Sequence, residues 1–297
     1  MRAADRPAIE TIIDLDPFEM PLSMLLPAAS VGALEPWRGL FDGDHIDFAR
    51  GMLRIAIKSF VVRVGGATIL VDACVGEHKE RPQRPDWHQR RGTGFLEKLA
   101  SVGCRPEDID MVMCTHLHAD HVGWNTRMDN GRWTPTFPNA RYIVGAEELS
   151  YWQGQAAQSP GVNHGSYQDS VLPILEAGMI ETVAADDEIL NGATIVPLAG
   201  HTAGQIGLQI SRADGPEVLF CGDALHSPVQ VPYPEWTSFL CFDPTAAVTT
   251  RERIIEQAAS SDLVLAPAHL RAAFGMRVKR DGARHAPVFC DCAGRAV

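Results

Sequence analysis

The stretch "CTHLHADHVGW", residues 114–124, holds three histidines and an aspartate within six consecutive positions, directly after a short apolar run. In an extended chain alternate side chains point to the same side, so His116 and His118 are expected to face one way. Asp120 and His121 follow where the chain can bend. One loop of this kind can supply ligands to two adjacent ions. Imidazole together with carboxylate favours zinc or another first-row metal over calcium or magnesium.

Three other apolar segments also run directly into residues that can bind metals. "ATIVPLAGH" ends at His201, "VLFCGD" ends at Asp223 and "LVLAPAH" ends at His269. Short, nearly continuous apolar runs are typical of buried strands, and helical patterns such as residues 245–260 lie between some of them. Sheets tend to place ligand sites where their strands end, so we expect these side chains to gather at one rim.

The rest of the chain is organised around these segments. Residues 59–76, "SFVVRVGGATILVDACVG", predict two strands joined at a Gly-Gly turn, and residues 95–103 predict a short helix. The Gln- and Ala-rich residues 153–166 read as a surface loop. Residues 1–50 are rich in Pro and Gly and predict an irregular N-terminal segment, with a lid or a dimer arm as its candidate roles. We interpret residues 1–297 as a single domain.

Composition narrows the classes of function. The 297 residues include 26 Lys and Arg against 37 Asp and Glu, a formal net charge of −11, which disfavours a surface for nucleic acid. We expect no membrane segment, because no apolar run approaches membrane-spanning length, and no secretory signal is read in the first residues. Seven cysteines dispersed through apolar segments favour reduced thiols and a cytoplasmic protein.

The combined motif resembles that of the metallo-β-lactamase-fold hydrolases, over roughly residues 55–275. The family's H-x-H-x-D-H signature stands here as His116, His118, Asp120 and His121, and its later ligands match His201, Asp223 and His269. The resemblance implies an α/β (α+β) chain folded as a four-layer αβ/βα sandwich. It also identifies Asp72, at the end of "TILVD", as a residue that supports the ligands from behind, although an aspartate that caps the loop is an equal alternative.

The resemblance further implies a dinuclear centre with two zinc ions, for which manganese, cobalt or iron are alternatives. One ion would be held by His116, His118 and His201 and the other by Asp120, His121 and His269, with Asp223 bridging them. In two-metal sites the ions lie about 3.5–4 Å apart and lower the pKa of a shared water, so that hydroxide attacks the substrate at neutral pH. Asp120 would orient this hydroxide and carry a proton.

Smaller features favour a branch of the family. True β-lactamases of this fold lack the bridging carboxylate that Asp223 provides, so hydrolysis of antibiotics is disfavoured. A lactonase or methyl-parathion-hydrolase-like enzyme is favoured, acting on a small ester or lactone, with phosphotriesters as a further substrate class. Where the quorum-quenching lactonases place a tyrosine, this chain has His226, which is either a catalytic donor to substrate or a structural histidine. Trp124 is the candidate substrate contact.

Two alternatives from other classes stay open. One is a mononuclear iron enzyme similar to the persulfide dioxygenases of the same fold, although these tend to leave some second-site ligands idle, whereas all seven positions are filled here. The other is a binding protein without catalysis. The expected partner is a small-molecule substrate, with a homodimer as a further expectation.

Overall fold

The computed structural model describes residues 8–212 and 215–297. By its internal contacts the chain divides into two compact units. Unit 1 comprises the described residues up to Asp14 together with Ile57–Ile195, and unit 2 comprises Leu15–Ala56 together with Val196–Val297. Each unit is therefore assembled from segments that are far apart in the sequence. The assignment of residues 1–297 to a single domain stays a prediction.

The first sheet has seven strands in the order β1-β3-β4-β5-β8-β9, with β2 paired to β3. Strands β3 and β4 are antiparallel, and Gly65 and Gly66 between them have φ angles of 58° and 82°. A two-residue hairpin turn requires such positive angles, so the predicted hairpin is confirmed. Strands β4, β5, β8 and β9 pair in parallel. The strands of this sheet are β1 (Ala8–Pro21), β2 (Ile46–Asp47), β3 (Met52–Val64), β4 (Ala67–Val71), β5 (Met111–Met113), β8 (Arg141–Gly145) and β9 (Ile180–Val183).

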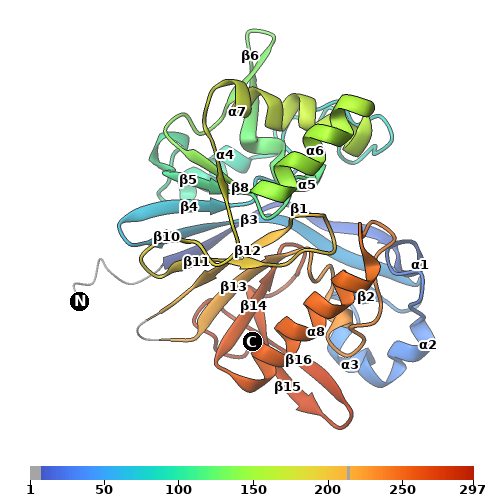
Figure 1. The fold of residues 1–297 in the computed structure, drawn as a ribbon. Coiled ribbons are helices and arrows are strands. Elements are labelled where there is room, and N and C mark those ends of the chain that lie inside the picture. The colour runs from blue at the N-terminus through green and yellow to red at the C-terminus, as the bar shows by residue number, and fades with distance from the viewer. Residues whose placement is uncertain (1–7, 213–214) are drawn as a thin grey trace. The chain divides into compact units, whose positions relative to one another are not determined.

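Helices of unit 1 lie beside its parallel strands. Helix α6 buries Leu149, Trp152 and Ala156 and packs against β8 and β9, and a two-stranded hairpin projects from the same unit (Figure 1). The predicted helix at 95–103 is confirmed as α4. These elements are α4 (Phe95–Ser101), η3 (Pro106–Asp108), α5 (Ala119–Val122), η4 (Gly123–Asn125), β6 (Thr126–Asp129), β7 (Arg132–Pro135), α6 (Ala146–Gln158), η5 (Val162–Gly165), η6 (Tyr167–Val171) and α7 (Leu172–Glu176).

The second sheet also has seven strands, in the order β10-β11-β12-β13-β14-β15-β16. The central β13 and β14 are parallel, and the apolar residues of β14 are all buried. The predicted strands that precede His201, Asp223 and His269 are confirmed as β11, β13 and β14. The strands are β10 (Glu188–Leu190), β11 (Ala193–Pro197), β12 (Ile206–Ile210), β13 (Glu217–Gly222), β14 (Leu263–Pro267), β15 (Gly275–Asp281) and β16 (Arg284–Cys290).

Helix α8 covers part of the sheet in unit 2. It begins after Asp243, whose side chain accepts hydrogen bonds from the backbone N–H groups of Thr245 and Ala246, as a helix N-cap does. It packs along β14 and β15 (Figure 1). Two sheets with helices confirm the predicted α/β class. The helices of this unit are α1 (Leu22–Leu25), α2 (Val31–Leu34), η2 (Glu35–Trp37), α3 (Arg38–Phe41), η7 (Pro228–Gln230) and α8 (Pro244–Ser260). None of the helices in the described residues is both long enough and apolar enough to cross a bilayer.

The N-terminal segment differs from the prediction. Residues 1–7 of the predicted irregular segment 1–50 lie outside the described residues, but β1 is a strand of 14 residues, and short helices follow it. Buried Ile12, Asp14, Phe18 and Met20 lie at even spacing among more exposed neighbours, which gives β1 one inward side. The alternation is short and Pro17 interrupts it, which is why the composition suggested irregular chain. A role as lid or dimer arm stays a prediction.

The predicted surface loop at 153–166 was also wrong in part. Helix α6 extends through residue 158, and the next turn, η5, spans Val162–Gly165. Ala and Gln are good helix formers, and Trp152 and Ala156 are buried on one side of the helix, so packing outweighs the single Gly154.

Candidate metal centre

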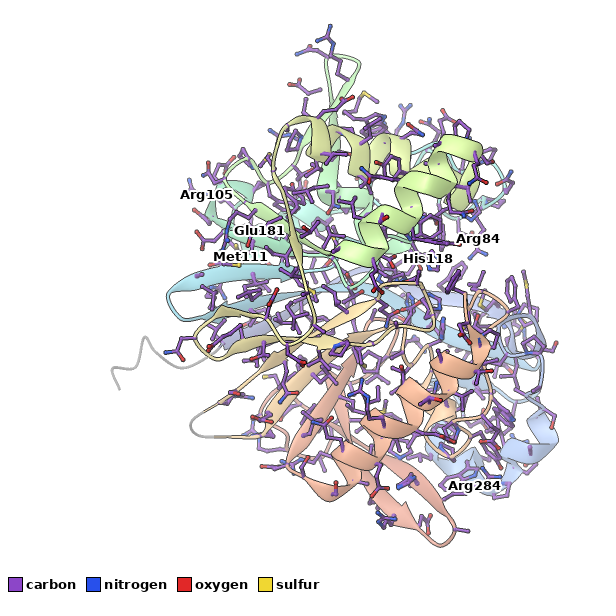
Figure 2. The ribbon with its side chains drawn as sticks, viewed as in Figure 1. Arg84, Arg105, Met111, His118, Glu181 and Arg284 are labelled. Atoms are coloured by element: carbon purple, nitrogen blue, oxygen red, sulfur yellow. The ribbon has the colours of Figure 1, made fainter. Side chains whose placement is uncertain are left out.

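Four of the predicted ligands lie between the end of β5 and the end of α5 in unit 1. The chain leaves the buried strand at Met113, bends at Thr115, is extended at His118 and enters α5, which carries Asp120 and His121. His116 and His121 are buried and His118 is partly buried. The predicted change of direction at Asp120 and His121 is observed as the start of α5, directly after the extended His118. Figure 2 labels His118, which lies beside helix α6.

The donor atoms of these side chains lie close enough to share metal ions. Nε2 of His116 is 3.1 Å from Nδ1 of His118, and the rings of His116 and His121 have centroids 4.0 Å apart. Nε2 of His121 is 3.9 Å from a carboxylate oxygen of Asp120. Ligands about 2.0–2.1 Å from a tetrahedral zinc ion are about 3.3 Å from one another, so the first pair fits such a site.

Asp72 supports this loop from behind. It lies after β4 with a left-handed φ of 58°, and its carboxylate accepts hydrogen bonds from the backbone N–H and the hydroxyl of Thr115. Its other oxygen is 2.8 Å from Nδ1 of His121. A carboxylate that accepts the Nδ1 proton leaves the Nε2 lone pair for a metal and raises the basicity of the imidazole. The structure therefore brings Asp72 to the position that the resemblance implies.

The end of the ligand helix is fixed by close backbone contact. The N–H of Gly123 donates to Cys74 O at 2.7 Å, and the N–H of Trp124 donates to Ala73 O at 2.6 Å. A Cβ atom at Gly123 would lie 1.9 Å from the carbonyl oxygen of Val75, so only glycine fits here. The Trp124 ring is buried and stacks on Phe95 with centroids 5.0 Å apart. Packing accounts for Trp124, and its contact with substrate stays a prediction.

In unit 2 the ligands come from the ends of separate strands. Asp223 follows β13 directly and His269 follows β14, and these parallel neighbours end together because Gly222 pairs with Pro267. His201 lies in the turn between β11 and β12, where its carbonyl accepts a hydrogen bond from the backbone N–H of Phe242 at 2.8 Å. The prediction that strand ends bring these ligands together is confirmed within this unit.

Asp223 is surrounded by imidazoles of its own unit. One carboxylate oxygen is 3.1 Å from Nε2 of His269, and the other is 3.5 Å from Nε2 of His201 and 3.4 Å from Nε2 of His226. The donor atoms of His201, Asp223 and His226 could hold a metal ion. Nδ1 of His269 is 2.8 Å from Ala56 O. That hydrogen bond leaves Nε2 of His269 for a metal. The spacings around Asp223 also match the edges of a zinc site, about 3.3 Å.

His226 is predicted to be either a donor to substrate or a structural histidine, and this choice stays open. The structure places its buried ring 4.7 Å from that of His201. Its backbone N–H donates to the side chain of Gln230 at 2.8 Å, which fixes the turn that carries it. His226 is therefore also a candidate metal donor in unit 2.

Sequence reasoning missed Arg251, a buried arginine of α8. Its Nε donates to Ala224 O at 2.9 Å and its Nη1 to Trp236 O at 3.2 Å, so it connects the loop after Asp223 to a second loop. Burial lowers the pKa of the Arg251 guanidinium to about 10, so the side chain stays charged at neutral pH. The available signal was its position on the side of α8 that also buries Ala247 and Ile254.

The other aromatic side chains near the ligand-bearing segments differ in their exposure to solvent. Trp152 and Trp236 are buried, and Trp236 stacks on Tyr233. Phe239 is 55% exposed and Phe242 is 56% exposed, and Leu240 between them is also exposed. This apolar loop precedes α8 and is bonded to His201 through its backbone.

The sequence of this chain is similar to that of a known protein family and to individual known proteins. A family model described as the metallo-beta-lactamase superfamily matches residues 54–269. An N-acyl homoserine lactonase of Agrobacterium fabrum is 22% identical over 245 residues, which cover 77% of this chain and 84% of that protein. A probable metallo-hydrolase of Mycobacterium tuberculosis is 28% identical over 134 residues, which cover 43% of this chain and 41% of that protein. The match therefore spans about two fifths of the mycobacterial protein.

Solved structures share the fold. One of them, AidC, is described as a dizinc quorum-quenching lactonase in complex with a product. It superposes with a TM-score of 0.75 at 17% identity, over 96% of this chain and 94% of that chain, which confirms the predicted fold. The relatives named here are lactonases or a metallo-hydrolase, and none of them supports the predicted iron-dioxygenase alternative.

Proposed function

Because this chain belongs to the metallo-beta-lactamase superfamily, we propose that it is a metal-dependent hydrolase that cleaves a small ester or lactone. The observation that carries the proposal is the pair of His and Asp clusters. Unit 1 gathers His116, His118, Asp120 and His121, and unit 2 gathers His201, Asp223, His226 and His269. Nitrogen and carboxylate donors in this ratio suit zinc, as the name of one structural relative also indicates for that protein.

The proposed ligand assignment follows the motif. His116, His118 and His201 would hold one zinc ion, Asp120, His121 and His269 the other, and Asp223 would bridge them. When bound, two such ions supply a hydroxide nucleophile at neutral pH and polarise the scissile carbonyl. The chain's own residues then have to orient the nucleophile, stabilise the substrate oxygen and move one proton.

Two residues are proposed for these steps. The Asp120 side chain is 16% exposed beside His121. A carboxylate oxygen there can orient the attacking hydroxide and carry its proton to the leaving oxygen. His226 is buried among the donors of unit 2, where its imidazole can donate a hydrogen bond to the substrate carbonyl oxygen as negative charge develops there. The exposed Phe239, Leu240 and Phe242, on the loop bonded to His201, favour a substrate with an apolar group.

Metal analysis combined with a substrate panel tests the proposal. Purified protein should hold about two zinc ions per chain, as two-metal hydrolases do, and should hydrolyse at least one γ-lactone, δ-lactone, aryl ester or phosphotriester. A chromogenic cephalosporin belongs in the panel because turnover of it above all others would point to a β-lactamase instead. Assays with manganese and cobalt identify the preferred metal. Protein that binds no metal, or that binds metal and hydrolyses none of these compounds, would overturn the proposal.

Two variants test the assigned roles. Asp120→Asn should keep the fold and lower kcat by about a hundredfold or more, because proton transfer by a positioned group contributes that much. His226→Ala should lower kcat while the zinc content stays that of the wild type. If His226→Ala loses zinc in proportion to activity, His226 is a metal ligand and not a donor to substrate.

A further inference from the structure

Two side chains from the α6–η5 segment of unit 1 hold the backbone on both sides of His118. The backbone N–H of Leu117 donates to the Glu148 carboxylate at 2.9 Å, and its carbonyl accepts from the side-chain amide of Asn163 at 2.7 Å. On the other side of His118, the backbone N–H of Ala119 donates to the Asn163 amide oxygen at 3.1 Å. Three backbone groups that flank one predicted ligand are thus bonded to two side chains.

An asparagine is chemically suited to this position. Its amide offers a donor and an acceptor in one plane, which matches the carbonyl of Leu117 and the N–H of Ala119. A carboxylate of the same size would turn an acceptor toward the Leu117 carbonyl. Asn163 adopts φ 51° and ψ 43°. Asparagine tolerates this left-handed conformation better than most other residues with a Cβ atom.

A buried ion pair holds the segment in this conformation. His164 is also left-handed, with φ 57°, and its carbonyl accepts a hydrogen bond from Arg81 at 3.0 Å. The buried Arg81 guanidinium binds both oxygens of Asp169, at 2.7 and 2.9 Å. Lys79 adds a hydrogen bond to the carbonyl of Asp169 at 3.1 Å. Two successive left-handed residues persist only where their surroundings determine them in this way.

Glu148 also connects to the His118 ring. The same oxygen that accepts from Leu117 accepts the indole N–H of Trp152 at 2.7 Å. The Trp152 ring meets the His118 ring edge to face, with centroids 5.5 Å apart and an interplanar angle of 70°. One buried carboxylate therefore fixes both the peptide before His118 and the aromatic ring that contacts the His118 imidazole.

We propose that Asn163, together with Glu148, is a positioning residue that sets the direction of the His118 imidazole for metal binding. The inference rests on the proposed function only insofar as His118 binds a metal. Without the hydrogen bonds from Asn163 and Glu148, the loop that carries His118 would become ordered only when the metal binds. The entropy lost in that ordering would lower the affinity for the metal. Groups that orient ligands from outside the coordination sphere typically contribute about 10- to 100-fold in metal affinity.

The decisive variant is Asn163→Gly, because glycine keeps the left-handed backbone and removes only the two side-chain bonds. Its zinc affinity, measured by competition with a chromogenic chelator, should fall about 10- to 100-fold. The visible absorption of the cobalt-loaded protein should also change, since the direction of one imidazole changes. Asn163→Asp, which turns an acceptor toward Leu117, should weaken zinc binding as well and serves as a second variant.

The matched control is Asn130→Gly. Asn130 is left-handed too, with φ 48°, but it lies in the exposed turn between β6 and β7. Thermal unfolding of both metal-free glycine variants shows whether either has lost the fold. Asn130→Gly should bind zinc as the wild type does, and Glu148→Gln, which keeps an acceptor, should retain more zinc affinity than Glu148→Ala. Folded Asn163→Gly protein with wild-type zinc affinity and cobalt spectrum would overturn the inference. Wild-type protein that binds no zinc would overturn the proposed function and the inference with it.

Discussion

The two units hold the proposed metal donors in place in different ways. In unit 1 four donors lie within His116–His121, and side chains support them: Asp72 holds His121, while Glu148 and Asn163 hold the backbone around His118. In unit 2 the donors come from separate strand ends, and backbone groups support two of them. Ala56 O accepts from Nδ1 of His269, and the N–H of Phe242 binds His201 O.

This difference predicts different responses to mutation. A side chain that supports a ligand can be removed without altering the strand that carries the ligand, so unit 1 should be sensitive at its supporting residues. Backbone support cannot be removed by a substitution, so unit 2 should be sensitive mainly at the donors and at the glycines that allow close approach.

Removal of a donor should give the largest effects and distinguish the units. His116→Ala deletes a ligand of one proposed ion, so the protein should keep about one zinc per chain, whereas Asp223→Ala deletes the proposed bridge and should leave less. Both should lower kcat/KM by about a thousandfold or more, because hydroxide formation and carbonyl polarisation depend on the metal. Elemental analysis and hydrolysis assays on the same preparations provide the measurement. Equal zinc contents in the two variants would contradict the bridging role.

Glycine substitutions should have the next largest effect, this time on folding. A Cβ at Gly123 would lie 1.9 Å from Val75 O, and a Cβ at Gly200, which has φ 132°, would lie 2.3 Å from the Ala247 nitrogen. We expect Gly123→Ala and Gly200→Ala each to lower the free energy of unfolding by about 3 kcal/mol, since backbone must move in both. Urea denaturation measures this change.

Each unit offers a control for this experiment. Gly154 in α6 and Gly39 in α3 have open space around the position of a Cβ atom. Alanine there should be neutral or stabilising by up to about 1 kcal/mol. A loss of stability at the controls as large as that at Gly123 and Gly200 would show that close backbone approach is not the cause.

Loss of a side chain that supports a proposed ligand should have a smaller effect, on zinc affinity. This effect distinguishes the two units most directly. Asp72→Asn removes the negative charge behind His121, and zinc affinity should fall about 10- to 100-fold, whereas the fold should persist. In unit 2 the corresponding side chain is Cys241, whose sulfur is 3.8 Å from Nδ1 of His201. Cys241→Ser should change zinc affinity less than Asp72→Asn, because a thiol is a weak partner. Competition with a chelator measures the zinc affinity of both variants. A larger loss of affinity in Cys241→Ser than in Asp72→Asn would contradict the difference between the units.

The smallest expected effect is a pH dependence of stability that Lys79 contributes in unit 1. Burial lowers the pKa of Lys79 to about 7. Above that pH, up to about pH 10, the unfolded chain binds more protons at this residue, so wild-type stability should rise with pH. In Lys79→Met, the increase in the free energy of unfolding between about pH 7 and 9 should be smaller than in the wild type, by an amount on the order of 1 kcal/mol. Arg251 stays charged over this range, so Arg251→Met should keep the wild-type slope. Denaturation at several pH values measures both; an unchanged slope in Lys79→Met contradicts the account.

The features that could be predicted from the sequence are those with a local signal in the chain. The hairpin, the strands before the donors and helix α8 are each visible in local periodicity, and the motif at 116–121 is contiguous. Glu148, Asn163 and Ala56 could not be predicted, because their partners lie 31, 46 and 213 residues away and carry no local signal. Strand β1 was missed because its alternation is short and interrupted by Pro17.

By itself the sequence determined which residues can donate to a metal, which strands deliver them and which family they belong to, since donor chemistry and hydrophobic periodicity are local properties of a chain. Only the tertiary structure decided which side chains orient those donors: the carboxylate behind His121, the amide that holds both sides of His118 and the guanidinium beneath the loop after Asp223. The physical reason is that orientation depends on hydrogen bonds between segments remote in sequence, and these exist only once the sheets have formed.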